Sequence, residues 1–280
     1  MVMIYMGMNR ILFVMWMAGM LLLSSCSVKE DRGGCPCWMT VDLSKVAESR
    51  QHIAESVVLR LRGNSDEDEV DYAFKMTETV NTEVGALEYE VPRGSVGVSV
   101  IGMPDRVGHD GIAGYDGDEI RIPVGAQMDS LYGFFRRFYT RCESVLCDVE
   151  LHKEFCTVSF TLGDDGYISP YDLEIWGNVA GVSAWDLMPL EGDFRFAPSP
   201  EDGVYRVRVP RQFDASLELV MLEDSEIVDR LPLGEYITRS GYDWAAEDLA
   251  DVHIALDMEK QQVMITVSGW DGVVVMDIVI

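Results

Sequence analysis

A cysteine at position 26 follows a segment whose residues favour lipid attachment. Arg10 provides a positive start, residues 11–23 form an apolar run, and two serines precede Cys26. This order is typical of a lipoprotein signal peptide cleaved directly before the cysteine. An ordinary secretory signal or a short membrane helix is the alternative, but the apolar run is shorter than the ~20 residues that a helical span needs. We predict that residues 1–25 are removed and that Cys26 carries acyl chains such as palmitate, which anchor the protein to the outer membrane.

Five further cysteines raise the question of redox or metal chemistry. They are Cys35, Cys37, Cys142, Cys147 and Cys156. An odd number leaves at least one thiol free or in an intermolecular bond, even in an exported chain. Cys35-Pro36-Cys37 looks like a metal or redox motif, but the sequence has no second Cys or His pair at a spacing that would complete a zinc site. We expect structural or buried thiols at all five positions, and their pairing stays open.

The sequence lacks the common catalytic signatures. It contains no Gly-x-Ser-x-Gly elbow, no phosphate loop of the Gly-x-x-x-x-Gly-Lys type and no His-Glu-x-x-His motif, and its four histidines are far apart. The acidic runs 66–69 and 116–119 could hold calcium weakly, although both lack the distal glutamate of a strong calcium loop. We expect no enzyme activity, no cofactor and no metal.

The chain is strongly acidic. Its 280 residues carry a formal net charge of -26, and removal of residues 1–25 takes away one basic residue and no acidic one. Nucleic acids and anionic lipid headgroups repel such a protein, so we expect no nucleic-acid partner and a membrane attachment that depends on lipid. A hydrophobic content of 48% is enough to form substantial cores.

Short β-prone runs separated by turn residues continue from residue 38 to the C-terminus. Residues 95–99, Ser-Val-Gly-Val-Ser, alternate with the period of two that a half-buried strand shows. Few segments have a helical period, although 47–53 and 244–249 could each form a turn or two. The pattern predicts an all-β fold.

The predicted strands fall into two series of six or seven. Each series spans about 120 residues, which suits two antiparallel β-sandwich domains in tandem. The predicted boundaries are 1–25 for the signal peptide, 26–34 for a lipidated tether, 35–152 for the first domain and 153–280 for the second. The alternative is that residues 152–154 only turn a hairpin within one domain.

Several segments together resemble the FimB/Mfa2-type fimbrillin-associated anchor lipoproteins of Bacteroides-like bacteria. The segments are the start Cys26-x-x-Lys29-Glu30-Asp31-x-x-x-Cys35-Pro36, the strand 38–43, Leu131-Tyr132-Gly133-Phe134, the strand 155–162 and the ending Thr266-Val267-Ser268-Gly269-Trp270. The resemblance covers nearly all of the mature chain. It implies two transthyretin-like domains, a lipid-anchored position at the base of a cell-surface fimbria (pilus), and pilin subunits as partners.

The last residues could supply the strand that binds a pilin. The candidate donor-strand residues are Val273, Val274, Val275, Met276, Ile278, Val279 and Ile280. Such an apolar, nearly uncharged segment must be buried somewhere, either as a strand of its own domain or against a fimbrial subunit through β-strand interactions. In the second case, deletion of residues 273–280 abolishes fimbrial attachment.

A cell-surface carbohydrate-binding lipoprotein is the alternative function. Aromatic residues lie beside Arg136 and Arg137, the most basic patch of the chain. These aromatic residues are Tyr132, Phe134, Phe135, Phe138 and Tyr139. On one strand they would point to both faces, which suits a core together with an interface, whereas sugar stacking is the competing interpretation.

Overall fold

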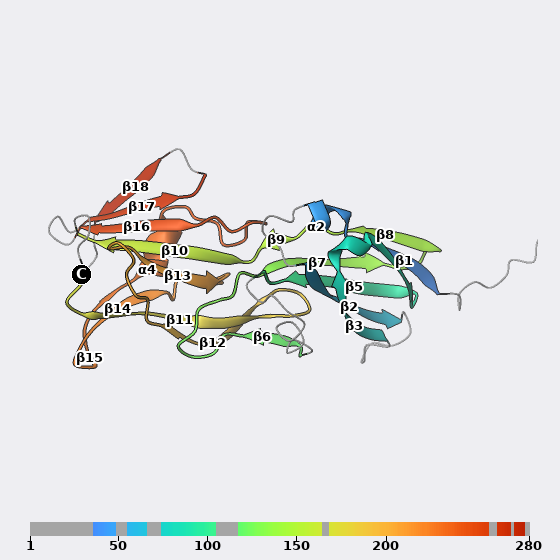
Figure 1. Cartoon of the computed structure of the whole chain (residues 1–280), viewed down its shortest axis with the longest axis horizontal. Helices are drawn as coiled ribbons and strands as arrows, with labels where there is room; N and C mark the ends of the chain where they lie inside the picture. Colours follow the sequence, from blue (N-terminus) through green and yellow to red (C-terminus); the bar gives the residue numbers. More distant parts are fainter. Residues whose placement is uncertain are drawn as a thin grey trace, which may run out of the picture. The chain divides into compact units, whose positions relative to one another are not determined.

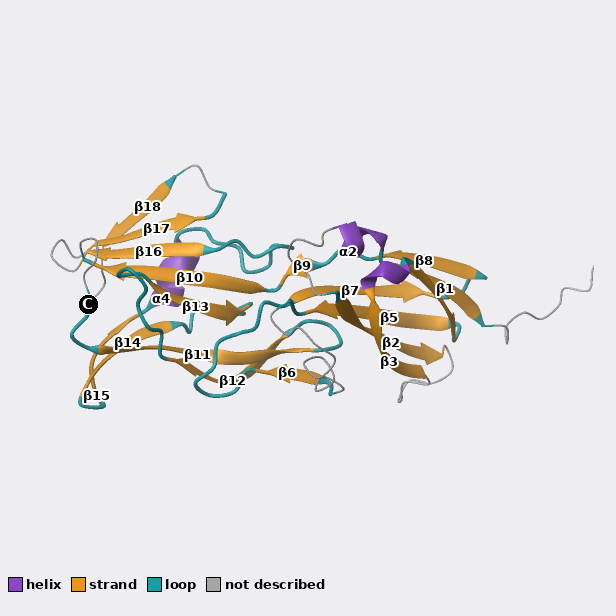
Figure 2. Ribbon diagram, in the orientation of Figure 1, coloured by secondary structure: helices purple, strands orange, loops and turns teal. Residues whose placement is uncertain are grey.

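The computed structural model describes residues 36–48, 55–65, 74–104, 117–163, 168–257, 262–269 and 272–277. Most of these residues lie in strands (Figure 2). The signal peptide, the tether, Cys26 and Cys35 lie outside the described residues, as do Ile278, Val279 and Ile280. In the described ranges, no helix combines the length and apolar character needed to cross a membrane.

Two sheets form from strands of the first half of the chain (Figure 1). Sheet A has the order β4 (Ala86–Val91), β1 (Cys37–Asp42) and β8 (Ser144–Asp148). Sheet B has the order β3 (Phe74–Asn81), β2 (Ser56–Ser65), β5 (Gly94–Gly102), β7 (Tyr132–Tyr139) and β9 (His152–Lys153). Val41, Leu59 and Val98 come from both sheets and are fully buried in one hydrophobic core. Alternation of apolar residues therefore gives each sheet one face toward this core.

Two more sheets form from strands of the second half. Sheet C has the order β12 (Pro189–Phe196), β11 (Asp172–Ser183), β14 (Glu218–Glu223) and β15 (Glu226–Leu231), and β6 (Glu119–Arg121) also pairs with β11. Sheet D has the order β13 (Tyr205–Pro210), β10 (Phe155–Leu162), β16 (Val252–Asp257), β17 (Gln262–Val267) and β18 (Val273–Asp277). The predicted all-β fold class is thus confirmed.

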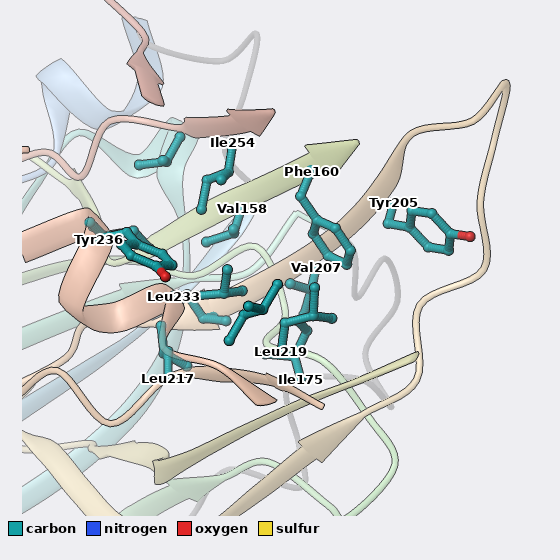
Figure 3. Packing of buried hydrophobic residues seen from close by; sticks show 14 of the residues in the cluster. Val158, Phe160, Ile175, Tyr205, Val207, Leu217, Leu219, Leu233, Tyr236 and Ile254 are labelled. Atoms are coloured by element: carbon teal, nitrogen blue, oxygen red, sulfur yellow. The ribbon is translucent and has the colours of Figure 1, made fainter. Parts of the chain in front are cut away.

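The core of the second half lies between sheets C and D. Phe160 of β10 stacks on Tyr205 of β13 with ring centroids 5.1 Å apart. Figure 3 shows Ile175 and Leu219 of sheet C packed in the same cluster as these residues, together with Tyr236 of α4 (Leu233–Arg239). Burial of large side chains from both sheets and the helix provides most of the stability of this half.

The two halves share one arrangement around their first strands. In sheet A, β1 pairs antiparallel with β4 and parallel with β8. In sheet D, β10 pairs antiparallel with β13 and parallel with β16. The prediction of antiparallel sheets therefore holds except for these two pairs. Parallel partners are distant in the sequence, so local turn signals do not reveal them.

Some contacts cross the predicted boundary at residue 152. Gly181 of β11 pairs with Arg121 of β6, and the Ser99 hydroxyl donates a hydrogen bond to the carbonyl oxygen of Ala184 at 2.8 Å. A third hydrophobic cluster contains Ile101 and Val182. The domain limits 35–152 and 153–280 stay a prediction.

The described helices are short. They are α2 (Ser44–Glu48), the 3₁₀ helix η2 (Thr82–Val84) and α4. The expected helical turns at 244–249 are wrong, because that segment forms turns and bends. Of the segment 47–53, Glu48 ends α2 and residues 49–53 lie outside the described part.

Three of the four described cysteines are buried, as expected, and one is exposed. The buried ones are Cys37, Cys147 and Cys156. Cys142 is exposed because it lies in the turn before β8, where its Sγ contacts the carbonyl oxygen of Ser144 at 3.1 Å.

Candidate functional site

The strand β18 lies at the edge of sheet D. Three successive valines open it, and β-branched residues favour an extended backbone. Val273 and Val275 are 57% and 55% exposed, whereas Met276 packs against the core of the second half. The predicted donor-strand residues that the structure describes therefore form one strand, whose outer face carries two exposed valines followed by the exposed Asp277.

The pairing of β18 leaves one of its edges open. The strand is antiparallel to β17, with Val273 opposite Thr266 and Asp277 opposite Gln262. In the order of sheet D, β18 comes last, and within the described residues no strand pairs with its other edge (Figure 1). Backbone N–H and carbonyl groups along that edge are a template for an incoming strand.

Charge distinguishes this edge from most others in the molecule. Edge strands commonly carry charged residues that discourage pairing with another chain. Among the described edge strands longer than two residues, β3, β4, β12, β13 and β15 each carry two or more charged side chains. The edge strands β18 and β8 carry one each, and of these two only β18 exposes two large apolar side chains.

A second candidate site is a cavity of about 170 Å³ on sheet B. It is lined by residues of β2, β5, β7 and the turn after β11. These residues are Arg62, Ser95, Gly97, Phe135, Arg137, Trp185 and Asp186. A side chain at Gly97 would lie 3.3 Å from the Phe135 ring, so glycine leaves the cavity open. The cavity combines two aromatic rings with two guanidinium groups, which suits a small polar ligand.

Ion pairs and hydrogen bonds hold Trp185 at this cavity. The Asp118 carboxylate accepts hydrogen bonds from Lys75 Nζ at 2.8 Å and from Trp185 Nε1 at 2.7 Å. These two bonds lower the pKa of Asp118, and the bond from Lys75 has the larger effect. The Arg62 guanidinium lies 5.5 Å from the centre of the Trp185 ring. Sequence reasoning missed this cluster because its members are far apart in the chain.

The aromatic residues of β7 divide between the two faces of sheet B, as expected. Phe134 is buried in the core between sheets A and B, and Phe138 packs against that core. Tyr132 meets Phe155 edge to face at 5.8 Å. Phe135 and Tyr139 are exposed, and of the five only Phe135 lines the cavity.

A larger groove near Trp176 is a poor sugar site. Its volume is about 740 Å³, and Trp176 lines it together with Arg195. The guanidinium carbons of Arg195 and Arg230 lie 4.2 Å and 4.8 Å from the centre of the Trp176 ring. The chain's own arginines therefore occupy the positions that a stacked sugar would need.

The acidic runs do not form a metal site where the structure describes them. Asp118 is bound to Lys75 and Trp185, and Glu119 pairs with Arg121 at 2.7 Å. Residues 66–69 and Asp116 lie outside the described residues. In the described part of the chain, no three Cys, His, Asp or Glu side chains are placed to hold a metal ion together.

The fold is that of several solved proteins of Bacteroides and related bacteria. Similar structures include a protein of Bacteroides ovatus provisionally named an adhesin, with 16% identity over 89% of this chain and 97% of that one, and a TM-score of 0.52. A protein of Bacteroides thetaiotaomicron provisionally named as polysaccharide-binding matches at 14% identity over 86% and 98%, with a TM-score of 0.54. The fimbrial anchor protein Mfa2 of Porphyromonas gingivalis matches at 11% identity over 88% and 100%, with a TM-score of 0.53.

These likenesses establish the fold. No protein-family model matches the chain, and no curated protein matches it. The fimbrial anchor among the similar structures is the kind of protein that the sequence resembles, so the resemblance is confirmed at the level of the fold.

Proposed function

We propose that this chain is an outer-membrane lipoprotein that anchors or terminates a cell-surface fimbria. Acyl chains on Cys26 would hold it to the membrane, and the free edge of β18 would bind a strand of a pilin subunit. The observation that carries the proposal is the open, nearly uncharged edge of β18 with its two exposed valines. The fold shared with a fimbrial anchor protein supports it.

Strand addition explains how such an edge could bind a subunit without a deep pocket. An incoming strand forms main-chain hydrogen bonds along β18, each contributing about 1 kcal/mol net. Its side chains lie beside Val273 and Val275 and bury their apolar surface. Because β18 stays paired with β17, the anchor keeps its own fold while it binds the subunit.

Lysines at positions 273 and 275 are expected to detach the fimbria. The V273K/V275K variant places two charges beside the incoming strand, and we expect about tenfold fewer fimbriae on cells and more in the medium. Electron microscopy of cells and immunoblots of the medium measure this. Both valines are exposed, so the unfolding midpoint should change little.

Val124 supplies a matched control for this experiment. It is a valine with 73% exposure that lies after β6, away from β18 in the sequence. The V124K variant should keep wild-type numbers of fimbriae. Full retention of fimbriae by V273K/V275K would rule out the β18 edge as the binding site. This double variant is sharper than deletion of residues 273–280, since deletion also removes the core contact of Met276.

The cavity at Phe135 supports a second candidate function, binding of an acidic saccharide. Its aromatic rings could stack on a sugar, and Arg62 and Arg137 could pair with a carboxylate. A similar structure provisionally named as polysaccharide-binding favours keeping this candidate.

Replacement of Phe135 tests the saccharide candidate. If the candidate is right, F135A should weaken retention in gels that contain polygalacturonate about tenfold, because a stacking platform is lost. F213A removes another exposed phenylalanine and should not change retention. Equal mobility of the wild type with and without the polysaccharide would rule out this ligand and leave the anchor proposal unaffected.

A further inference from the structure

Two cysteines that are far apart in the sequence meet at the start of sheet A. Cys37 is the first residue of β1, and β1 runs parallel to β8 with Trp38 opposite Ser144. The N–H of Trp38 donates a hydrogen bond to the carbonyl oxygen of Glu143 at 2.9 Å. Continuing this register puts Cys37 beside Glu143, next to Cys142. Neighbouring positions on paired strands are about 5 to 6 Å apart, which is a Cα separation that disulfides span.

The Cys142 side chain also lies close enough to Cys37 to affect its ionisation. Burial raises the pKa of Cys37, and the neighbouring Cys142 thiol raises it further. Cys142 is exposed and therefore accessible to an oxidant, whereas Cys37 is buried behind it.

The other described cysteines do not compete for this bond. Cys147 lies in the first core and Cys156 in the second. Burial raises the pKa of each thiol to about 12, so neither forms the reactive thiolate to a useful extent at neutral pH. Cys35 lies outside the described residues, so the mapping of the bonds uses a C35S variant to distinguish it from Cys37.

We propose that Cys37 and Cys142 form a disulfide in the exported protein. The oxidant is a protein that carries a reactive disulfide, as in oxidising compartments outside the cytoplasm. The Cys142 thiolate attacks that disulfide and releases one thiolate of the oxidant. Deprotonated Cys37 then attacks the Cys142 sulfur and releases the second. Two thiols of this chain thus lose two protons and two electrons, and the oxidant's disulfide becomes two thiols.

The bond would strengthen the end of the fold that bears the membrane load, an inference that rests on the proposed anchor function. β1 is the first described strand after the tether and is the central strand of sheet A. A pulling force applied through the tether would reach Cys37 before the later strands, because Cys37 begins β1. A disulfide to Cys142 closes a loop of roughly 100 residues, and closure of a long loop restricts the unfolded chain strongly.

Mapping of the bonds in the full-length lipoprotein tests the proposal. The protein is extracted from membranes without reductant, its free thiols are alkylated, and it is digested with trypsin and a glutamate-specific protease, which separates Cys142 from Cys147. We expect a peptide with Cys142 linked to Cys37, present in C35S and absent in C37S. Linkage of Cys142 to Cys35, or alkylation of Cys142 in the untreated protein, would overturn the proposal.

Thermal unfolding gives an independent readout. Reductant should lower the Tm of the wild type and of C35S by about 5 to 15 °C. Because Cys142 is exposed, C142S removes the bond without changing a core, and its Tm should be low and insensitive to reductant. An equal response of C142S and the wild type would contradict the disulfide. Both readouts are independent of fimbriae, so failure of the disulfide is distinguishable from failure of the anchor proposal.

Discussion

Replacement of Arg211 by methionine is expected to lower the free energy of unfolding by about 3 to 5 kcal/mol. Arg211 follows β13, and its Nε donates to the Glu154 carboxylate at 2.9 Å, with the two side chains only 15% and 8% exposed. Its Nη1 donates to the carbonyl oxygens of Trp244 and Ala246 at 2.6 Å and 2.7 Å. The variant leaves a buried carboxylate and two carbonyl groups without this partner. Urea unfolding at neutral pH measures the loss.

An exposed ion pair gives the control for this prediction. Arg206 pairs with Glu201 at 3.2 Å, with side chains 51% and 82% exposed, and R206M should cost under about 1 kcal/mol. Burial already raises the pKa of Glu154 despite Arg211, so the E154Q/R211M double variant should recover part of the stability lost in R211M. A loss in R211M no larger than that in R206M would show that the buried pair does not support the fold.

Replacement of Gly181 by alanine is expected to cost about 2 to 4 kcal/mol. Gly181 has a φ of +154°, and a Cβ there would lie 2.2 Å from the carbonyl oxygen of Ile120. The obstacle is backbone of the paired strand β6, so it cannot rotate away as a side chain would. The alanine variant should therefore separate β6 from β11 and expose Ile120, which is buried in the third hydrophobic cluster.

Gly117, just before β6, provides a control for the general effect of adding a methyl group. A Cβ at Gly117 would have no contact closer than 3.9 Å, and the backbone there is not in the left-handed region. G117A should change the free energy of unfolding by under about 1 kcal/mol. Similar values for G117A and G181A in urea unfolding would mean that the close contact of β6 with β11 is not formed.

Strands with strong alternation could be predicted from the sequence, and strands without it could not. Val96, Val98 and Val100 mark β5 because their side chains enter one core. In contrast, five of the six residues of β15 are exposed, so the strand leaves no periodic pattern. The turns at 244–249 looked helical, but carbonyl oxygens of Trp244 and Ala246 accept hydrogen bonds from Arg211 in a nonhelical segment.

The candidate site was predictable only in part, because long-range strand pairing brings its residues together. A run of three valines marks β18 as a strand, but its place at the edge of sheet D depends on long-range pairing with β17. The cavity at Trp185 depends on pairs such as Lys75 with Asp118, whose spacing in the sequence has no local meaning. The proximity of Cys37 to Cys142 likewise follows from the parallel register of β1 and β8.

The most direct test of the proposed anchor function is photo-crosslinking on cells that assemble the fimbria. A photoreactive amino acid is placed at Val275 in one variant and at Val124 in another, since both side chains are exposed. We expect a covalent adduct with a pilin subunit from position 275 and none from position 124. No pilin adduct from position 275, or equal adducts from both positions, would contradict binding at the edge of β18.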